Sequence, residues 1–191
     1  RFVRLCAART ATELNLTSLA EDTGITQPTA KQWLTALRIA MIVTLLQPHH
    51  ASYRKRLRKR PRLHFLDTGL VCYLLGIESA SVLARHPLRG AIFESFVVSE
   101  IVKAYTHAGR EPRLFHWRDA TGHEIDLIVD TGEGLVPVEI KSGRTVTTDM
   151  LGGIRWWMGL SGNPTTQGVV VHGGTGHQQR DGVHVLPWYI H

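Results

Sequence analysis

A pair of alternating strands joined by a short polar loop constrains this chain more than any other stretch. Residues 123–143 read HEIDLIVDTGEGLVPVEIKSG, with apolar residues at every second position on both sides of TGEG. This alternation predicts a β-hairpin, because successive side chains of a strand point to opposite faces. With a four-residue loop, Thr131–Gly134, opposed residues have numbers that sum to 265. One face then carries apolar pairs: Ile125 with Ile140, Leu127 with Val138, and Val129 with Val136.

The other face of this hairpin brings acidic side chains together. The same register sets Asp126 opposite Glu139, and Glu124 opposite Lys141. Opposed side chains lie about 5 Å apart at Cβ, so the two carboxylates repel each other. Mg²⁺ or Mn²⁺ between them would reverse the sign of that interaction, and the carbonyl of Ile140 can add a ligand. Lys141 would orient a water or stabilise a negative transition state. The pattern predicts a metal-dependent phosphodiesterase site; the alternative is a solvated surface hairpin.

A third acid is expected on the helix predicted over Gly90–Tyr105. On a helical wheel Glu94 falls inside an apolar stripe, whereas Glu100 points elsewhere. The stripe is formed by Val97, Val98, Ile101 and Tyr105. A carboxylate on a buried face is costly unless it is paired or binds a metal. Glu94 is therefore predicted to join the acids of the hairpin as a catalytic residue and metal ligand.

The first half of the chain predicts a helix-turn-helix over Leu16–Arg38. Gly24 ends the first helix, and Thr26 caps the second. The predicted buried stripe of the second helix is Ala30, Trp33, Leu34 and Leu37. Its exposed side, where base edges are read in such motifs, carries Gln27, Thr29, Lys31 and Gln32.

A basic segment, Tyr53–Arg62, follows this motif. Seven of its ten residues are Lys or Arg, and the whole chain has a net charge of +6 and a pI near 9.7. Strands predicted over Met41–Gln47 and Arg62–Leu66 flank it, which together with the helix-turn-helix indicates a winged helix. Its candidate contacts to nucleic acid, most simply DNA, are Arg54, Lys55, Arg56, Arg58, Lys59 and Arg60. The alternative is a winged helix that packs against protein only.

The composition narrows the setting of the chain. The chain has no run of about 18 apolar residues, so a membrane span is not expected. Cys6 and Cys72 are too few for a disulfide framework, so a reducing cytoplasm is expected. The chain starts without Met or a secretory signal, and we interpret it as a piece of a longer protein.

Two domains are predicted, with the boundary near HPLRG, His86–Gly90. Residues 1–85 would form the winged helix-turn-helix. Residues 86–191 would form a mixed α/β domain around a central sheet, with a helix over Thr148–Leu160 and strands over Val169–Val171 and Val183–Leu186.

The order of the acids and lysine resembles the PD-(D/E)xK nuclease superfamily, whose fold is restriction-endonuclease-like. The chain also resembles the C-terminal region of a prokaryotic AAA+ ATPase family, the domain of unknown function DUF4143. The stretches that carry this likeness are LTSLAEDTGITQPTAKQWL, FLDTGLVCYLLG, GAIFESFVVSEIVK, FHWRDATGHEIDLIV, VPVEIKSG and VLPW. The resemblance implies an ATPase module upstream, where ATP would bind, since the chain itself has no GxxxxGK[ST].

Two functions follow as expectations. In the first, the chain is a metal-dependent DNA endonuclease or resolvase-like phosphodiesterase with a nucleic-acid-binding winged helix. In the second, it is a non-catalytic DNA- or protein-binding module that regulates the upstream ATPase. The sequence leaves the oligomeric state open.

Overall fold

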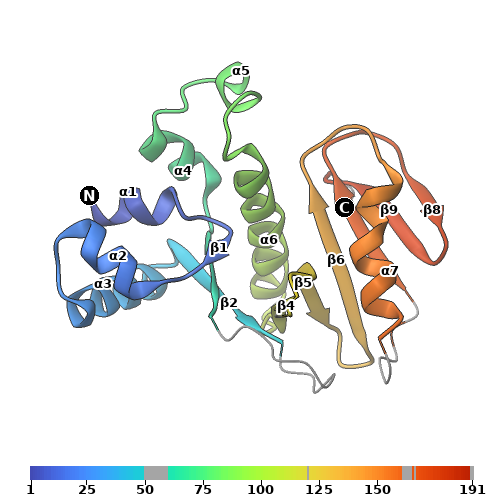
Figure 1. Cartoon of the computed structure of the whole chain (residues 1–191), viewed down its shortest axis with the longest axis horizontal. Coiled ribbons are helices and arrows are strands. Elements are labelled where there is room, and N and C mark those ends of the chain that lie inside the picture. Colours follow the sequence, from blue (N-terminus) through green and yellow to red (C-terminus); the bar gives the residue numbers. More distant parts are fainter. Residues whose placement is uncertain (50–59, 120, 161–164, 166, 190–191) are drawn as a thin grey trace. The chain divides into compact units, whose positions relative to one another are not determined.

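The computed structural model describes residues 1–49, 60–119, 121–160, 165 and 167–189, and the chain divides into two compact units (Figure 1). The described residues form seven α-helices, one 3₁₀ helix and nine strands. The first unit spans Arg1–Leu46 and Arg60–Ala104. The second contains the end of β2 from Gln47 and the chain from Tyr105 onward.

The first unit is mainly helical. Its elements are α1 (Phe2–Ala7), β1 (Thr12–Glu13), α2 (Leu16–Thr23), α3 (Gln27–Ile39), β2 (Val43–Pro48), β3 (Arg62–Phe65), α4 (Thr68–Leu75), α5 (Ala80–Leu83) and α6 (Arg89–His107). β3 pairs antiparallel with β1 on one side and with β2 on the other.

Helices α2 and α3 form around a turn that the sequence specifies locally. Gly24 ends α2 in the left-handed conformation, with φ of 80°, which glycine adopts without a steric penalty. Thr26 then caps α3, because its side chain accepts a hydrogen bond from the N–H of Thr29. Helix, turn, helix and an antiparallel strand pair therefore occur in the predicted order. The winged-helix assignment stays a prediction, because residues 50–59 of the basic segment lie outside the described residues.

The predicted buried stripe of α3 is wrong at one position. Ala30 and Leu34 are buried, but Trp33 is 45% exposed. Its ring meets that of Phe2 edge-on, with centroids 5.4 Å apart. The stripe is therefore narrower than the spacing suggested, because α1 covers only part of the indole.

Helix α6 packs with the first unit. The hydroxyl of Ser95 lies 2.8 Å from that of Thr10 and 3.1 Å from Nδ1 of His64, and all three side chains are buried. The compact units consequently divide after Ala104, whereas the domains predicted from the sequence divide between residues 85 and 86. No helix in the described part of the chain is both long and apolar enough to cross a membrane.

The second unit is built on a mixed sheet. Its elements are β4 (Leu114–Arg118), β5 (Glu124–Asp130), β6 (Leu135–Lys141), the 3₁₀ helix η1 (Thr148–Leu151), α7 (Gly152–Met158), β7 (Gly168–His172), β8 (Gln178–Arg180) and β9 (Val183–Pro187). The strand order is the end of β2, then β4, β5, β6, β7, β9 and β8. β2–β4, β6–β7 and β7–β9 are parallel pairs, and the others are antiparallel. The chain is therefore a mixed α/β protein, as predicted.

Helix α7 covers a face of this sheet, where it contacts β5, β6 and β7 (Figure 1). Ile154 and Trp157 of α7 are fully buried, in one core with Trp117 and Val170 of the sheet. Trp157 therefore belongs to the core. Its neighbour Trp156 is only partly buried.

The predicted hairpin register is confirmed. Leu127 pairs with Val138 and Val129 with Val136, so opposed numbers sum to 265. The loop is the predicted four residues, closed by a hydrogen bond of 3.0 Å from the N–H of Thr131 to the carbonyl of Gly134. The hairpin that carries the acids thus lies inside the sheet, with β4 beside β5 and β7 beside β6.

Candidate functional site

The acid pair lies where the regular pairing of β5 with β6 stops. The ladder runs from Asp130 opposite Leu135 to Leu127 opposite Val138. One residue further, Oδ2 of Asp126 accepts the backbone N–H of Ile140 at 2.9 Å. In a continued antiparallel ladder that N–H would bond to a backbone carbonyl of the facing strand. A side chain has therefore replaced a backbone acceptor at this point.

Both carboxylates are removed from solvent. Asp126 and Glu139 are each 5% exposed, and their neighbours on the same face, Ile128 and Pro137, are also buried. A solvated surface hairpin would leave this face exposed, so the structure does not fit that alternative. Buried carboxylates need countercharges or hydrogen-bond donors, since an unpaired buried charge is strongly unfavourable.

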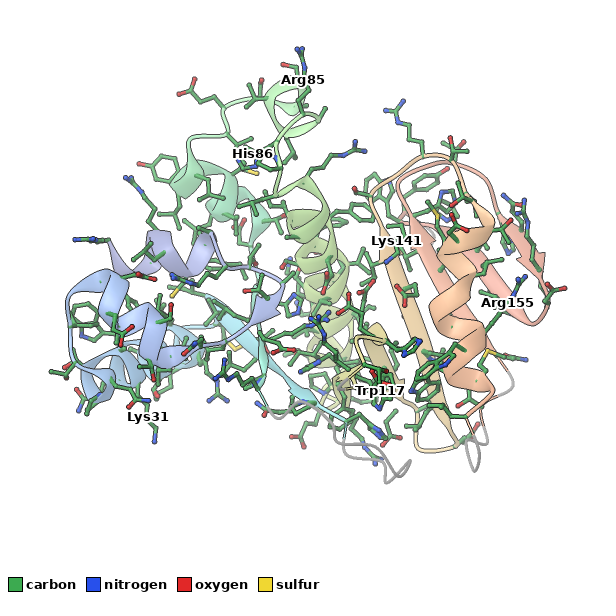
Figure 2. All side chains as sticks on the ribbon, viewed as in Figure 1. Lys31, Arg85, His86, Trp117, Lys141 and Arg155 are labelled. Atoms are coloured by element: carbon green, nitrogen blue, oxygen red, sulfur yellow. The ribbon has the colours of Figure 1, made fainter. Side chains whose placement is uncertain are left out.

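Lys141 supplies the countercharge. Its Nζ lies 2.8 Å from Oε2 of Glu139 and 3.3 Å from Oδ2 of Asp126. The side chain extends from the end of β6 and is 39% exposed (Figure 2). The regular ladder stops before Glu124, so its predicted position opposite Lys141 stays a prediction. The carboxylate of Glu124 forms an ion pair with Arg118, at 3.4 Å.

Two carboxyl groups share the ammonium of Lys141 in this trio. Burial, reinforced by the carboxylate of Asp126, raises the pKa of Glu139 to about 8. Burial also opposes the charge of Lys141, but Asp126 and Glu139 outweigh it and raise the pKa of Lys141. One ammonium thus balances one carboxylate, and the second carboxyl group favours its protonated form at neutral pH. A second cationic charge at this place would displace that proton.

Gly153 of α7 is a site residue that the sequence alone did not reveal. A Cβ at this position would lie 2.7 Å from Oε1 of Glu139 and 3.4 Å from the carbonyl oxygen of Glu124. The missing side chain therefore lets the carboxylate of Glu139 lie against the helix backbone. The signal in the sequence is the pair Gly152–Gly153 inside the helix predicted over Thr148–Leu160, because glycine weakens a helix interior.

Glu94 is placed in the first unit, where it has partners of its own. Its Oε1 lies 3.3 Å from a guanidinium nitrogen of Arg62 and 4.0 Å from Nε2 of His64. The side chain of Glu94 is 14% exposed, so the inference that it is largely buried was sound. Arg62 accounts for that burial without a metal. The predicted role of Glu94 beside Asp126 and Glu139 stays a prediction.

Most of the predicted nucleic-acid contacts that the structure describes in the first unit are exposed. Gln27, Lys31 and Gln32 of α3 and Arg60 are exposed, and Thr29 is half-buried beside the cap of α3. The remaining predicted contacts, Arg54, Lys55, Arg56, Arg58 and Lys59, lie outside the described residues.

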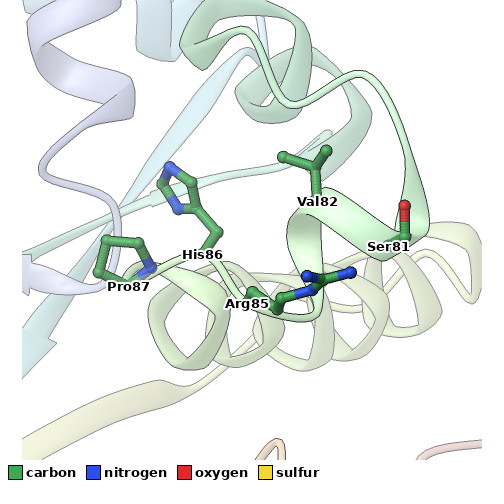
Figure 3. Close-up of a pocket in the computed structure, with 5 residues that line it drawn as sticks. All are labelled: Ser81, Val82, Arg85, His86 and Pro87. Atoms are coloured by element: carbon green, nitrogen blue, oxygen red, sulfur yellow. The ribbon is translucent and has the colours of Figure 1, made fainter.

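Two further observations bear on ligand binding. In the described part of the chain, no three or more His, Cys, Asp or Glu side chains gather closely enough to hold a metal ion. At the acid pair the candidate donors are two carboxylates, and a cation such as Mg²⁺ could complete its coordination there with waters. A pocket of about 430 Å³ beside α5 is lined by Ser81, Val82, Arg85, His86 and Pro87, none of them buried (Figure 3). Without a buried polar group it suggests no ligand.

In a comparison with known protein families, each half of the chain matches a different family model. Residues 89–190 match the model described as domain of unknown function DUF4143, and residues 1–81 match that described as domain of unknown function DUF8612. The chain is 35% identical over 127 residues to uncharacterized proteins of Mycobacterium tuberculosis and Mycobacterium bovis. These alignments cover 66% of this chain and 28% of each relative. No solved structure matches the chain.

Proposed function

The chain belongs to the DUF4143 family, and we propose that Asp126, Glu139 and Lys141 form a metal-dependent site that hydrolyses phosphodiester bonds of DNA. The observation that carries this proposal is the burial of two opposed carboxylates around one ammonium. A structural ion pair needs one acid for one lysine. The second acid leaves a protonated carboxyl group in the metal-free site, which is a cost that a binding site for a divalent cation explains.

Asp126 and Glu139 are the residues that would hold the cation, with the carbonyl of Ile140 as an additional ligand. A divalent cation bound there would lower the pKa of an attacking water and neutralise charge on the phosphate. In the hydrolysis, a new P–O bond would form to the water oxygen while the bond to the leaving sugar oxygen breaks, and the proton lost by the water is balanced by the proton that solvent gives to the leaving oxygen. Lys141, freed from one carboxylate, would donate hydrogen bonds to a phosphate oxygen as negative charge builds on it.

The first unit would present the substrate. Its α3 exposes Gln27, Lys31 and Gln32, and the basic segment adds charge that suits a polyanion. The matched relatives extend well beyond the aligned part, which is consistent with an ATPase module elsewhere in the polypeptide. Under this proposal that module moves or remodels DNA while the second unit cleaves it.

A nuclease assay tests the central claim. Branched, single-stranded and duplex DNA are incubated with the protein in Mn²⁺ or in EDTA. Cleavage is expected only with Mn²⁺, and it should be lost in Lys141→Ala and in Asp126→Asn. Glu124→Gln is the matched control, since it changes an exposed acid of the same strand that pairs with Arg118. Metal-independent cleavage, or cleavage by the Asp126 variant, would refute the assignment.

The role of the basic segment has its own test. Each phosphate contact contributes about 0.9 to the slope of log affinity against log salt on duplex DNA. Replacing Arg56, Arg58 and Lys59 together by Ala should reduce that slope by an amount set by how many of them touch phosphates. An unchanged slope with unchanged affinity would remove the segment from the interface.

The competing proposal is a non-catalytic module that binds DNA or protein and regulates the ATPase. The observation that favours it is that Lys141 already contacts both acids. In that case the trio only stabilises the end of the hairpin. Mn²⁺ would then bind neither the parent nor the variants, and DNA binding, where present, would not depend on the cation.

A further inference from the structure

Three aromatic rings pack in sequence near the acid pair of the second unit, and we call them the stack, although only two of the rings are parallel. The imidazole of His123 is nearly parallel to the indole of Trp156, with ring centroids 3.8 Å apart and planes inclined by 6°. Trp156 in turn packs on the buried Trp117, with centroids 5.4 Å apart. The side chain of His123 is 46% exposed. The stack therefore runs from the core and ends at the surface in the ring of His123.

The ring of His123 is fixed by polar contacts at its edge. The hydroxyl of Thr121 donates a hydrogen bond to Oδ1 of Asp119 at 2.7 Å. The hydroxyl oxygen of Thr121 also lies 2.9 Å from Nδ1 of His123. Because the hydroxyl proton is directed to Asp119, Nδ1 is the donor in the second contact. Asp119 is itself buried and also accepts the backbone N–H groups of Thr121 and His123. The imidazole is thus held in one orientation before any ligand arrives.

The stack is close to the acids along two elements. His123 lies immediately before β5 and three residues ahead of Asp126, and three residues of extended chain span at most about 10 Å. Trp156 lies one turn of α7 beyond Gly153, the residue that touches Glu139. A nucleic acid with a phosphate at Asp126 and Glu139 would therefore bring a neighbouring nucleotide to His123.

We propose that His123 is a stacking platform for an unpaired nucleobase next to the phosphate held at the acid pair. This rests on the proposed nuclease function and specifies its substrate class, because a base inside a duplex already has both faces covered. The substrate is thus a nucleic acid with single-stranded character at the cleavage point. A ring held by Asp119, Thr121 and Trp156 loses little conformational freedom on binding, which is why a fixed ring favours stacking.

The test compares His123→Leu with His123→Phe. Leucine keeps Trp156 covered but has no flat ring, whereas phenylalanine keeps the ring and loses the polar edge. The parent and both variants are prepared with Lys141→Ala, which stops cleavage under the proposed mechanism. Their binding to a short single-stranded oligonucleotide that contains 2-aminopurine is measured in Mn²⁺, so that the acid pair can hold the phosphate, and a duplex of the same sequence is the control. His123→Leu should lose about ten-fold or more in single-strand affinity and most of the fluorescence quenching. His123→Phe should stay near the parent, and duplex binding should be the same in all three proteins.

The proposal is overturned if His123→Leu binds the single strand as tightly as the parent, or if none of the proteins binds nucleic acid. It is also overturned if the Leu and Phe variants lose the same amount of single-strand affinity, or if His123→Leu loses as much affinity for the duplex as for the single strand. The cleavage assay separates this proposal from the nuclease proposal. Cleavage in Mn²⁺ with no effect of His123→Leu on binding refutes the platform alone, whereas His123-dependent binding without cleavage refutes the nuclease alone.

Discussion

Replacing Glu139 by Gln should remove a loss of stability that the parent shows as pH rises. Burial and Asp126 raise the pKa of Glu139 to about 8, whereas an unfolded chain releases the same proton near 4.5. Between these values the folded protein holds a proton that the unfolded chain has lost, so the free energy of unfolding falls as pH rises. Below pH 4.5 both states are protonated and this contribution is fully present.

The size of the effect follows from that difference in pKa. One pKa unit corresponds to about 1.4 kcal/mol, and pH 7 lies roughly two and a half units above the pKa of the unfolded chain. The parent should therefore lose about 3 kcal/mol between pH 4 and pH 7 through this residue. A glutamine cannot titrate, so Glu139→Gln should lack that loss. The difference in stability between variant and parent should grow by about 3 kcal/mol over the same range.

Urea denaturation of both proteins in EDTA, at several pH values between 4 and 8, measures this difference. Titrating groups away from the trio contribute equally to both proteins and cancel, so the difference reports Glu139 together with Asp126 and Lys141, which interact with it. Glu124→Gln, on the same strand but 42% exposed, serves as the control and should follow the parent. Parallel curves for Glu139→Gln and the parent across the whole range would show that the carboxyl group of Glu139 titrates normally, and the reasoning about the buried acid pair would be wrong.

Adding metal should narrow or close the difference in stability between the variant and the parent. A cation that binds only the folded parent stabilises it by about 2.7 kcal/mol at one hundred times its dissociation constant. Glu139→Gln has lost one of the two carboxylates and should gain much less. At pH 7 the variant is thus expected to be the more stable protein in EDTA, and the parent should recover most or all of that difference in Mn²⁺. Melts of the parent that do not respond to Mn²⁺ would exclude the metal site.

Three further perturbations address individual contacts. Gly153→Ala places a methyl group 2.7 Å from Oε1 of Glu139 and should lower Mn²⁺ affinity several-fold in calorimetric titrations. Gly152→Ala, where nothing lies within 4 Å, should leave affinity unchanged and stabilise the helix by up to about 1 kcal/mol; equal effects of the two alanines would contradict the contact. Lys141→Met removes the cation that competes for the two acids, so Mn²⁺ should bind several-fold more tightly while cleavage is lost, and weaker binding would show that Lys141 helps to form the site. Arg62→Met leaves Glu94 buried without its guanidinium partner and should cost about 3 kcal/mol in chemical denaturation. The double variant with Glu94→Gln should recover part of that loss, and no recovery would mean that Arg62 acts through other contacts.

Local sequence patterns determined the elements that carry the site. Alternation of apolar residues and the four-residue loop were sufficient to set the register of β5 with β6, because a hairpin of fixed loop length has one register. The turn between α2 and α3 was equally local, since Gly24 and Thr26 act on backbone groups within a few residues of themselves. The boundary between the two compact units could not be predicted from local patterns, because α6 packs through Ser95 onto residues that are distant in sequence.

Only the tertiary structure decided the environment of those residues. The sequence showed two acids but not that both faces of the hairpin are covered, since burial depends on α7 and the flanking strands. It could not show that the ammonium of Lys141 contacts both acids, because the reach of a long side chain depends on the folded backbone around it and not on register alone. The close approach of Gly153 to Glu139 joins elements that no periodicity connects. Sequence specifies short-range hydrogen bonds and alternation, whereas pKa values and the partners of buried charges arise from segments brought together by folding.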